Sequence, residues 1–202
     1  PDPAAAYSLR SLTGGDPKAV RVRRSSDNSE QDFTVSEINS GALVAYVGSG
    51  NDGFVETWYD QSGNGNNAVQ ETAGSQPKIV SSGTFLNELD FDGTDDNFEL
   101  TSVLGITSAA AIFTVAESGG GNDKIILDNR DGGVDGFRFF RIGDDIEYRW
   151  QSAVVDTGTT PATNTKFLGF ANHDGSNASA AVNGATATTT SDTSSISVAA
   201  KP

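Results

Sequence analysis

The chain has 202 residues, and its 36% hydrophobic content is enough to bury a sizeable core. Its formal net charge of −14 repels phosphate backbones and anionic lipid surfaces, so we expect no nucleic-acid partner and no membrane insertion. The absence of cysteine rules out a disulfide framework and a thiolate metal site.

The first part of the chain predicts one strand, one loop and one helix. Residues 19–24 have the composition of a strand, and residues 25–32 form a polar loop rich in turn formers. Over residues 34–47 the apolar side chains fall near helical spacing, with Ser36 as the N-cap and Gly48 as the stop. This is the one short helix that the sequence predicts.

A small group of basic residues lies on the first predicted strand. Because Arg21 and Arg23 alternate with valines, we expect both side chains on one solvated face of the strand. In so acidic a chain they are expected to pair with carboxylates. A basic binding function for them is disfavoured.

The chain is organised around residues 54–68. The first half alternates apolar and polar residues like a strand with one buried face, and the second half is rich in Gly and Asn, which favour tight turns. Where strand becomes loop, aromatic rings stand beside a carboxylate and amides, a combination that binding proteins use for stacking and for hydroxyl groups. The alternative is a core tryptophan followed by an aspartate that caps its own turn. The candidate ligand-binding residues here are Trp58, Tyr59, Asp60, Asn64 and Asn66.

Two further strands, at 78–80 and 85–91, lead into an acidic turn at residues 92–97. Its carboxylates Asp92, Asp95 and Asp96 make it a weak candidate for calcium, which prefers six to eight oxygen ligands. The spacing does not match an EF-hand loop. The alternative is a turn between strands whose carboxylates cap backbone amides.

The second half of the chain reads as continuous β-structure. An apolar run at 109–117 predicts a strand buried on both faces, and tight hairpins are expected at 143–145 and at Asn183-Gly184. The tail, 185–197, is low-complexity Thr, Ser and Ala, predicting an edge strand or partial disorder. Further strands are predicted at 98–100, 124–128, 136–142, 146–150, 167–172 and 178–182.

The single histidine, His173, is expected to lie in a turn. A lone His makes a poor metal site, and no Ser or Cys nucleophile stands in a recognisable elbow beside it. Strands that recur about every 8–12 residues are typical of a β-sandwich, and sandwiches of this size are commonly one domain. We therefore expect an all-β chain with a single lectin-like domain over residues 1–202.

One motif carries a resemblance to known families. The stretch from Tyr59 to Asn66 is similar to the YDQSGNGN motif found in the catalytic domain of family-54 α-L-arabinofuranosidases and in many tail and capsid-associated proteins of bacteriophages. The viral resemblance extends through residues 6–10, 20–28 and 89–96, roughly the first half of the chain. It implies a concanavalin-like or laminin-G-like (jelly-roll) two-sheet antiparallel β-sandwich, with a short helix before the central strand.

The resemblance implies one of two functions, hydrolysis of arabinofuranosides or a structural role in a bacteriophage virion. The arabinofuranosidases carry adjacent cysteines and a nucleophilic Glu, but the nearest counterpart here, residues 127–132, has neither. We therefore do not expect an enzyme. We expect an adhesion module of a bacteriophage virion, either a capsid decoration protein or a fibre-associated protein. Arg130 is added to the candidate ligand-binding residues. Its expected partners are capsid or tail proteins, a cell-surface glycan, or both. It is expected to form a homo-oligomer. No cofactor is expected other than calcium at the acidic turn. The alternatives are an arabinofuranosidase-type hydrolase and a structural cement protein.

Overall fold

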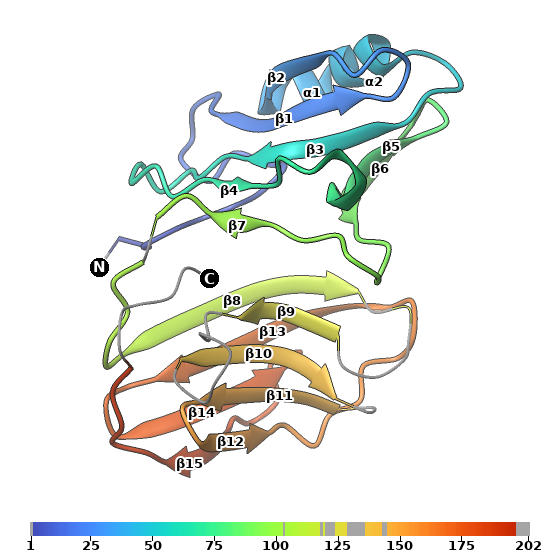
Figure 1. The fold of residues 1–202 in the computed structure, drawn as a ribbon. Helices are drawn as coiled ribbons and strands as arrows, with labels where there is room; N and C mark the ends of the chain where they lie inside the picture. The colour runs from blue at the N-terminus through green and yellow to red at the C-terminus, as the bar shows by residue number, and fades with distance from the viewer. Residues whose placement is uncertain are drawn as a thin grey trace. The chain divides into compact units, whose positions relative to one another are not determined.

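The computed structural model describes residues 2–102, 104–117, 119, 124–128, 136–142 and 145–196. By its internal contacts the chain divides into two compact units, residues 1–104 and 105–202, which are described separately (Figure 1). Strands joined in antiparallel pairs are the main regular structure of the described residues, which confirms the predicted all-β class. The single domain over residues 1–202 stays a prediction.

The first unit is a seven-stranded antiparallel sheet with the order β2-β1-β3-β4-β7, in which β5 pairs with β3 and with β6. The central strand β3 therefore lies between β1 on one edge and both β4 and β5 on the other. A 3-10 turn, η1 (Ala73–Ser75), precedes β5. The strands are β1 (Lys18–Arg24), β2 (Glu30–Thr34), β3 (Gly53–Trp58), β4 (Ala68–Val69), β5 (Lys78–Ser81), β6 (Thr84–Asp90) and β7 (Glu99–Leu100).

The predicted loop at 25–32 is too long, because its last three residues belong to β2. Cross-strand charge explains this strand: Arg21 lies opposite Asp32, and its guanidinium Nε is 3.0 Å from a carboxylate oxygen of Glu30. Opposite charges on paired strands stabilise an edge that has few apolar residues. The pairing of Arg21 with carboxylates was predicted.

The predicted helix over 34–47 is interrupted, giving two short helices, α1 (Val35–Asn39) and α2 (Ala42–Val47). Gly41 adopts a left-handed φ of 84° between them, and Gly48 ends the second helix as expected. The N-cap is Thr34 rather than Ser36, because only Thr34 has a glutamate three residues later. Thr34 Oγ1 accepts from the Glu37 amide while the Glu37 carboxylate accepts from the Thr34 amide, which is a capping box. Within the described part of the chain, neither helix nor any other is long and apolar enough to cross a membrane.

The predicted position of Arg23 in β1 is wrong. It was expected on the solvated face with Arg21, yet it is only 9% exposed. Its guanidinium donates to Gln76 Oε1 at 2.7 Å, to Asn28 Oδ1 at 2.8 Å and to the carbonyl of Ala73 at 2.9 Å. These partners lie in the connection between β1 and β2 and in or beside η1 (Ala73–Ser75), so the Arg23 guanidinium binds neutral oxygens where a carboxylate was expected.

The core of the first unit joins the sheet to the two helices. Valines of β1 and β3 belong to the same buried cluster as apolar side chains that stand three or four residues apart on the helices. Each helix therefore turns one apolar face toward the sheet. Half-buried aromatic and leucine side chains surround this cluster. Its buried members are Ala19, Val20, Val22, Phe33, Val35, Ile38, Leu43, Val47, Val55, Ile79 and Val80.

The second unit is a sandwich of two four-stranded antiparallel sheets, with the orders β12-β11-β10-β9 and β15-β14-β13-β8. Inward side chains of both sheets share one aromatic core that includes Phe137, Phe139, Tyr148, Trp150 and Phe167. Within the predicted tail, residues 188–191 form an edge strand, β15. The strands are β8 (Ala110–Glu117), β9 (Lys124–Asp128), β10 (Phe137–Ile142), β11 (Asp145–Trp150), β12 (Ala153–Asp156), β13 (Lys166–His173), β14 (Asn177–Val182) and β15 (Thr188–Ser191).

Strand β8 was expected to be buried on both faces, and this is wrong. Its burial alternates, with Phe113 72% exposed and Val115 71% exposed. Only the inward side chains, such as Ile112, reach the core. The outward Phe113 instead packs beside Phe170 of β13, with ring centroids 5.1 Å apart. The apolar run therefore reflects cross-strand pairing on an open face rather than burial.

His173 is a core residue rather than a turn residue. It is the last residue of β13, is 1% exposed, and stacks on Trp150 with ring centroids 4.1 Å apart. Nδ1 lies 2.9 Å from the Ser108 carbonyl oxygen and Nε2 lies 3.1 Å from that of Asp192. The turn begins one residue later, at Asp174, whose carboxylate accepts from the amides of Ser176 and Asn177. The expected hairpin at 143–145 rests on residues 143 and 144, outside the described residues.

Candidate functional site

The loop after β3 is held by Asp60. Its Oδ1 accepts from the amides of Ala6 and Ser62 at 2.9 and 2.8 Å, and its Oδ2 accepts from the Ser62 hydroxyl and the Asn66 amide at 2.7 and 3.0 Å. Burial opposes the ionised form, but these hydrogen bonds outweigh it, so the pKa of Asp60 is lowered. The aspartate thus caps its own turn, as the alternative interpretation expected.

The loop also binds the N-terminal segment, residues 2–12, which we call the strap. Gln61 is buried, and its amide nitrogen donates to the carbonyls of Ser8 and Arg10 while its oxygen accepts from the Leu12 amide. Asn64 and Asn66 both donate to the Ala4 carbonyl, at 3.2 and 2.8 Å. The polar groups that the sequence offered to a ligand therefore contact the chain's own backbone.

The two aromatic candidates are half-buried. Trp58 packs between Tyr7 of the strap and Phe98, with ring centroids 5.5 and 6.2 Å away, and its Nε1 has no hydrogen-bond partner among the described residues. The Tyr59 hydroxyl donates to Asp32 at 2.7 Å, and burial together with this carboxylate raises the pKa of Tyr59 to about 12. The structure brings together all the candidate ligand-binding residues except Arg130, which lies outside the described residues. A ligand role for them stays a prediction.

The acidic turn after β6 gathers the three aspartates of the calcium hypothesis. Carboxylate oxygens of Asp92, Asp95 and Asp96 lie within 4.8 Å of one another, a spacing at which a hard cation can bind several oxygens. Asp92 accepts from the Thr94 amide, and Asp96 accepts from the Asp92 amide, so these carboxylates also cap the turn. Burial and the neighbouring negative charges raise the pKa of Asp96.

A cavity of about 250 Å³ adjoins this turn. Its wall combines one aromatic ring with an amide, an ammonium group and carboxylates, supplied by β3, β5, β6 and the connecting segments. It is lined by Phe54, Gly74, Gln76, Lys78, Asp90, Asp92 and Asp96.

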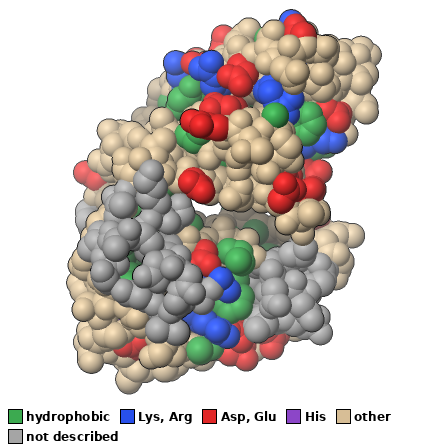
Figure 2. Space-filling model, viewed as in Figure 1, with side chains coloured by type: hydrophobic (Ala, Val, Ile, Leu, Met, Phe, Trp, Pro, Cys, Tyr) green, Lys and Arg blue, Asp and Glu red, His purple; other side chains and the backbone are tan. Residues whose placement is uncertain are grey.

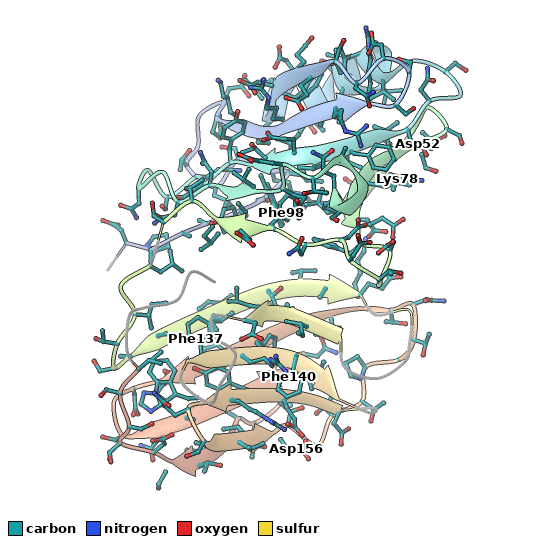
Figure 3. The ribbon with its side chains drawn as sticks, viewed as in Figure 1. Asp52, Lys78, Phe98, Phe137, Phe140 and Asp156 are labelled. Atoms are coloured by element: carbon teal, nitrogen blue, oxygen red, sulfur yellow. The ribbon has the colours of Figure 1, made fainter. Side chains whose placement is uncertain are left out.

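The cavity residues are fixed by their neighbours. Lys78 pairs with Asp52 at 2.9 Å (Figure 3) and lies 5.6 Å from the centroid of the Phe54 ring. The Arg23 guanidinium lies 4.8 Å from the same ring. On the face seen in Figure 2, blue basic side chains lie among red acidic ones in the upper part, where Figure 1 places β1 to β6. The lining of the cavity includes an ammonium group and an amide that can donate hydrogen bonds and carboxylates that can accept them.

Sequence reasoning missed most of this cavity. It singled out Asp92 and Asp96, but not Phe54, Lys78 or Asp90. One signal was available. Phe54 lies on the face of β3 opposite to the buried Val55, and a large aromatic ring on the partly exposed face of a strand needs an explanation.

Comparisons with known proteins place the fold. No family model matches the chain, and no curated protein matches it. Three solved structures do, all arabinofuranosidases: a Glu-to-Gln mutant of a GH54 α-L-arabinofuranosidase soaked with 4-nitrophenyl α-L-arabinofuranoside (TM-score 0.66, 14% identity), a GH54 α-L-arabinofuranosidase soaked with a cyclic sulfate inhibitor (0.65, 13%), and an arabinofuranosidase complexed with arabinofuranosyl-α-1,2-xylobiose (0.59, 14%).

Each match covers 96% of this chain and 50% of the other, so the chain spans half the length of these enzymes. At this identity the likeness shows the fold alone. The β-sandwich implied by the motif is therefore confirmed as a fold, shared with carbohydrate-active proteins.

Proposed function

We propose that this chain is a non-catalytic adhesion module that binds a glycan in the cavity beside β3 and β5. The observation that carries the proposal is the composition of the wall: the Phe54 ring stands beside the carboxylates of Asp90 and Asp96 and the ammonium of Lys78. Sugars present an apolar ring face and a rim of hydroxyl groups, and a stacking ring with convergent donors and acceptors matches both.

The charge of the cavity narrows the class of glycan. Three carboxylates and one ammonium line it, and the ammonium is already paired with Asp52. A uronic or sialic acid would be repelled, whereas neutral sugars and amino sugars would not. About 250 Å³ is below the usual size of small-molecule pockets, which favours a single sugar residue of a longer glycan.

A virion setting is part of the proposal. It rests on the resemblance of the first half of the chain to bacteriophage tail and capsid-associated proteins, with coat or tail proteins as neighbours and a cell-surface glycan as target. An exterior module of this kind benefits from a strongly acidic surface, because like charge keeps particles soluble.

A glycoside hydrolase is the second candidate, favoured by one observation. Asp96, whose pKa is raised, lies within 4.8 Å of the Asp92 carboxylate, and glycoside hydrolysis needs one protonated and one ionised carboxyl group close together. Asp96 would serve as the acid and Asp92 as the partner.

The test is binding of the purified chain to a panel of neutral, amino and acidic glycans, in calcium and in chelator, with released sugar assayed in the same wells. Two matched variants locate the site. Asp90→Asn changes the cavity, and Asp60→Asn changes the loop that the sequence singled out, with folding checked by circular dichroism.

We expect neutral or amino sugars to bind, with at least about tenfold loss in Asp90→Asn and none in a folded Asp60→Asn. Loss in Asp60→Asn alone moves the site to the loop. Sugar release that Asp96→Asn abolishes supports the hydrolase. A blank panel from folded protein contradicts the proposal and favours a structural cement protein.

A further inference from the structure

The strap is bound by the loop after β3 as an extended peptide is bound by a receptor. Side chains of the loop reach strap residues that are 49 to 62 positions away in sequence. The Gln61 amide forms three hydrogen bonds with the strap, at 2.8, 2.9 and 3.0 Å, and the Gln61 backbone amide donates to the Ala6 carbonyl at 2.7 Å. We call residues 60–66 the clamp.

The clamp contacts mainly the backbone of the strap. Its hydrogen-bond partners there are the carbonyls of Pro3, Ala4, Ala6, Ser8 and Arg10 and the amides of Ala6 and Leu12. One strap side chain adds specificity: Tyr7 packs on Trp58, and its hydroxyl donates to the Asn66 carbonyl. Because backbone groups carry the contact, any strap of this sequence in this conformation satisfies the clamp, whichever chain it comes from.

The strap is joined to β1 by an exposed, glycine-containing connection. Gly14 has a left-handed φ of 77°, and a Cβ placed at Gly14 or Gly15 would meet no atom within 4 Å. Residues 13–16 are all exposed. Asp16 is held to α1, because its Oδ1 accepts from the Ser36 amide at 2.8 Å. Packing does not fix residues 13–15, so this part of the connection can act as a hinge.

We propose that the clamp takes the strap of a second copy of this chain, giving a strap-exchanged oligomer. Every contact of the strap with the clamp is preserved on exchange, so the balance between the closed monomer and the exchanged form depends on the hinge and on the local concentration of chains. The strap suits this role because it carries one acidic and one basic residue, Asp2 and Arg10, so it approaches an acidic neighbour without net charge. This inference is independent of glycan binding.

Disulfide trapping tests it, because the chain has no cysteine of its own. One population carries Ala4→Cys and a second carries Asn64→Cys; the Asn64 amide nitrogen lies 3.2 Å from the Ala4 carbonyl oxygen. The two are mixed at high concentration, oxidised and resolved by mass. A chain with both substitutions measures the closed form, and Ala4→Cys mixed with the exposed Thr94→Cys is the control for random collision.

The hinge gives a matched pair of variants. Deleting Gly14 and Gly15 strains the closed form, and we expect at least about a tenfold rise in the ratio of interchain to intrachain disulfide. Inserting two further glycines relaxes it, and the ratio should fall. Gln61→Ala weakens strap binding equally in both forms, so it should accelerate exchange about tenfold without moving the ratio.

Interchain disulfide above the collision control, with this order of hinge variants, supports the proposal. Intrachain disulfide alone, at every concentration and in the shortened hinge, overturns it. Should neither disulfide form, sedimentation decides: an oligomer of the shortened-hinge chain that the lengthened hinge dissociates supports exchange, and a monomer throughout overturns it.

Discussion

The interactions that stabilise the inside of the first unit differ from those that stabilise the inside of the second. In the first unit, buried or half-buried polar side chains such as Asp60, Gln61 and Arg23 bind the backbone of distant segments. In the second, aromatic rings stack in the core, with Trp150 between His173 and Phe137 at 4.1 and 6.0 Å. Irregular segments have unpaired backbone groups that need polar partners, whereas two facing sheets mainly need their apolar faces filled.

The largest expected effect is in the aromatic core. Trp150→Ala removes a fully buried ring that stacks on two others, and we expect it to lower the free energy of unfolding by about 3–5 kcal/mol, measured by urea denaturation. The control is Phe113→Ala on the open face of β8, with an expected loss below about 1 kcal/mol. Equal losses would mean that the exposed face of β8 is covered.

Overpacking the same core is expected to cost less. A Cβ at Gly169 would lie 2.6 Å from the Phe139 ring, so Gly169→Ala should lower the free energy of unfolding by about 1–3 kcal/mol. Gly74→Ala in the first unit meets no atom within 4 Å and should change it by less than about 0.5 kcal/mol. If the two substitutions cost the same, the sandwich core is looser than its contacts indicate.

The loss of the N-cap of α1 in the first unit is expected to lower the free energy of unfolding by less than either change in the core. Thr34→Ala removes one side of the capping box of α1 and should cost about 1 kcal/mol in thermal unfolding. Ser36→Ala, at the N-cap expected from sequence, should cost less, because the cap hydrogen bond belongs to Thr34. A reversed order would place the start of the helix at Ser36.

The smallest effects are electrostatic and have opposite signs in the two units. The pKa of Asp96 is raised, so its ionised form destabilises the fold; Asp96→Asn should raise Tm at pH 7 by a degree or two, roughly, and the gain should shrink as the pH falls through that pKa. The pKa of Asp174 is lowered by hydrogen bonds from the Ser176 and Asn177 amides, so its ionised form stabilises the fold. Asp174→Asn should therefore lower Tm at pH 7, and the loss should fade as the pH drops through the lowered pKa. Two shifts of the same sign would contradict these assignments.

Sequence reasoning predicted what depends on local chemistry. The strands around Val20 and Val55 follow from alternation, and the strand at 78–80 follows from two adjacent β-branched residues. The capping role of Asp60 follows from the Asn and Gly residues after it. The break at Gly41 was missed because a glycine within a helical pattern can be tolerated or can end the helix, and the apolar spacing is the same in both cases.

What the sequence could not give depends on distant contacts. The cavity joins Phe54 to Asp90 and Asp96, and the strap joins Ala4 to Asn66, and neither pair is marked by any local pattern. Likewise, the position of His173 in its strand does not reveal that Ser108 and Asp192 supply carbonyl oxygens to both ring nitrogens. Chain topology, which a single sequence leaves open, creates these sites.

The placement of the two tryptophans has a spectroscopic consequence. The chain has only two, and one lies in each unit: Trp58 beside the strap and Trp150 in the sandwich core. Each half of the chain thus carries its own intrinsic fluorophore, and Trp58→Phe or Trp150→Phe leaves one emission signal for one half. Coincident unfolding curves from the two variants would identify a single cooperative domain, and separate curves would identify two.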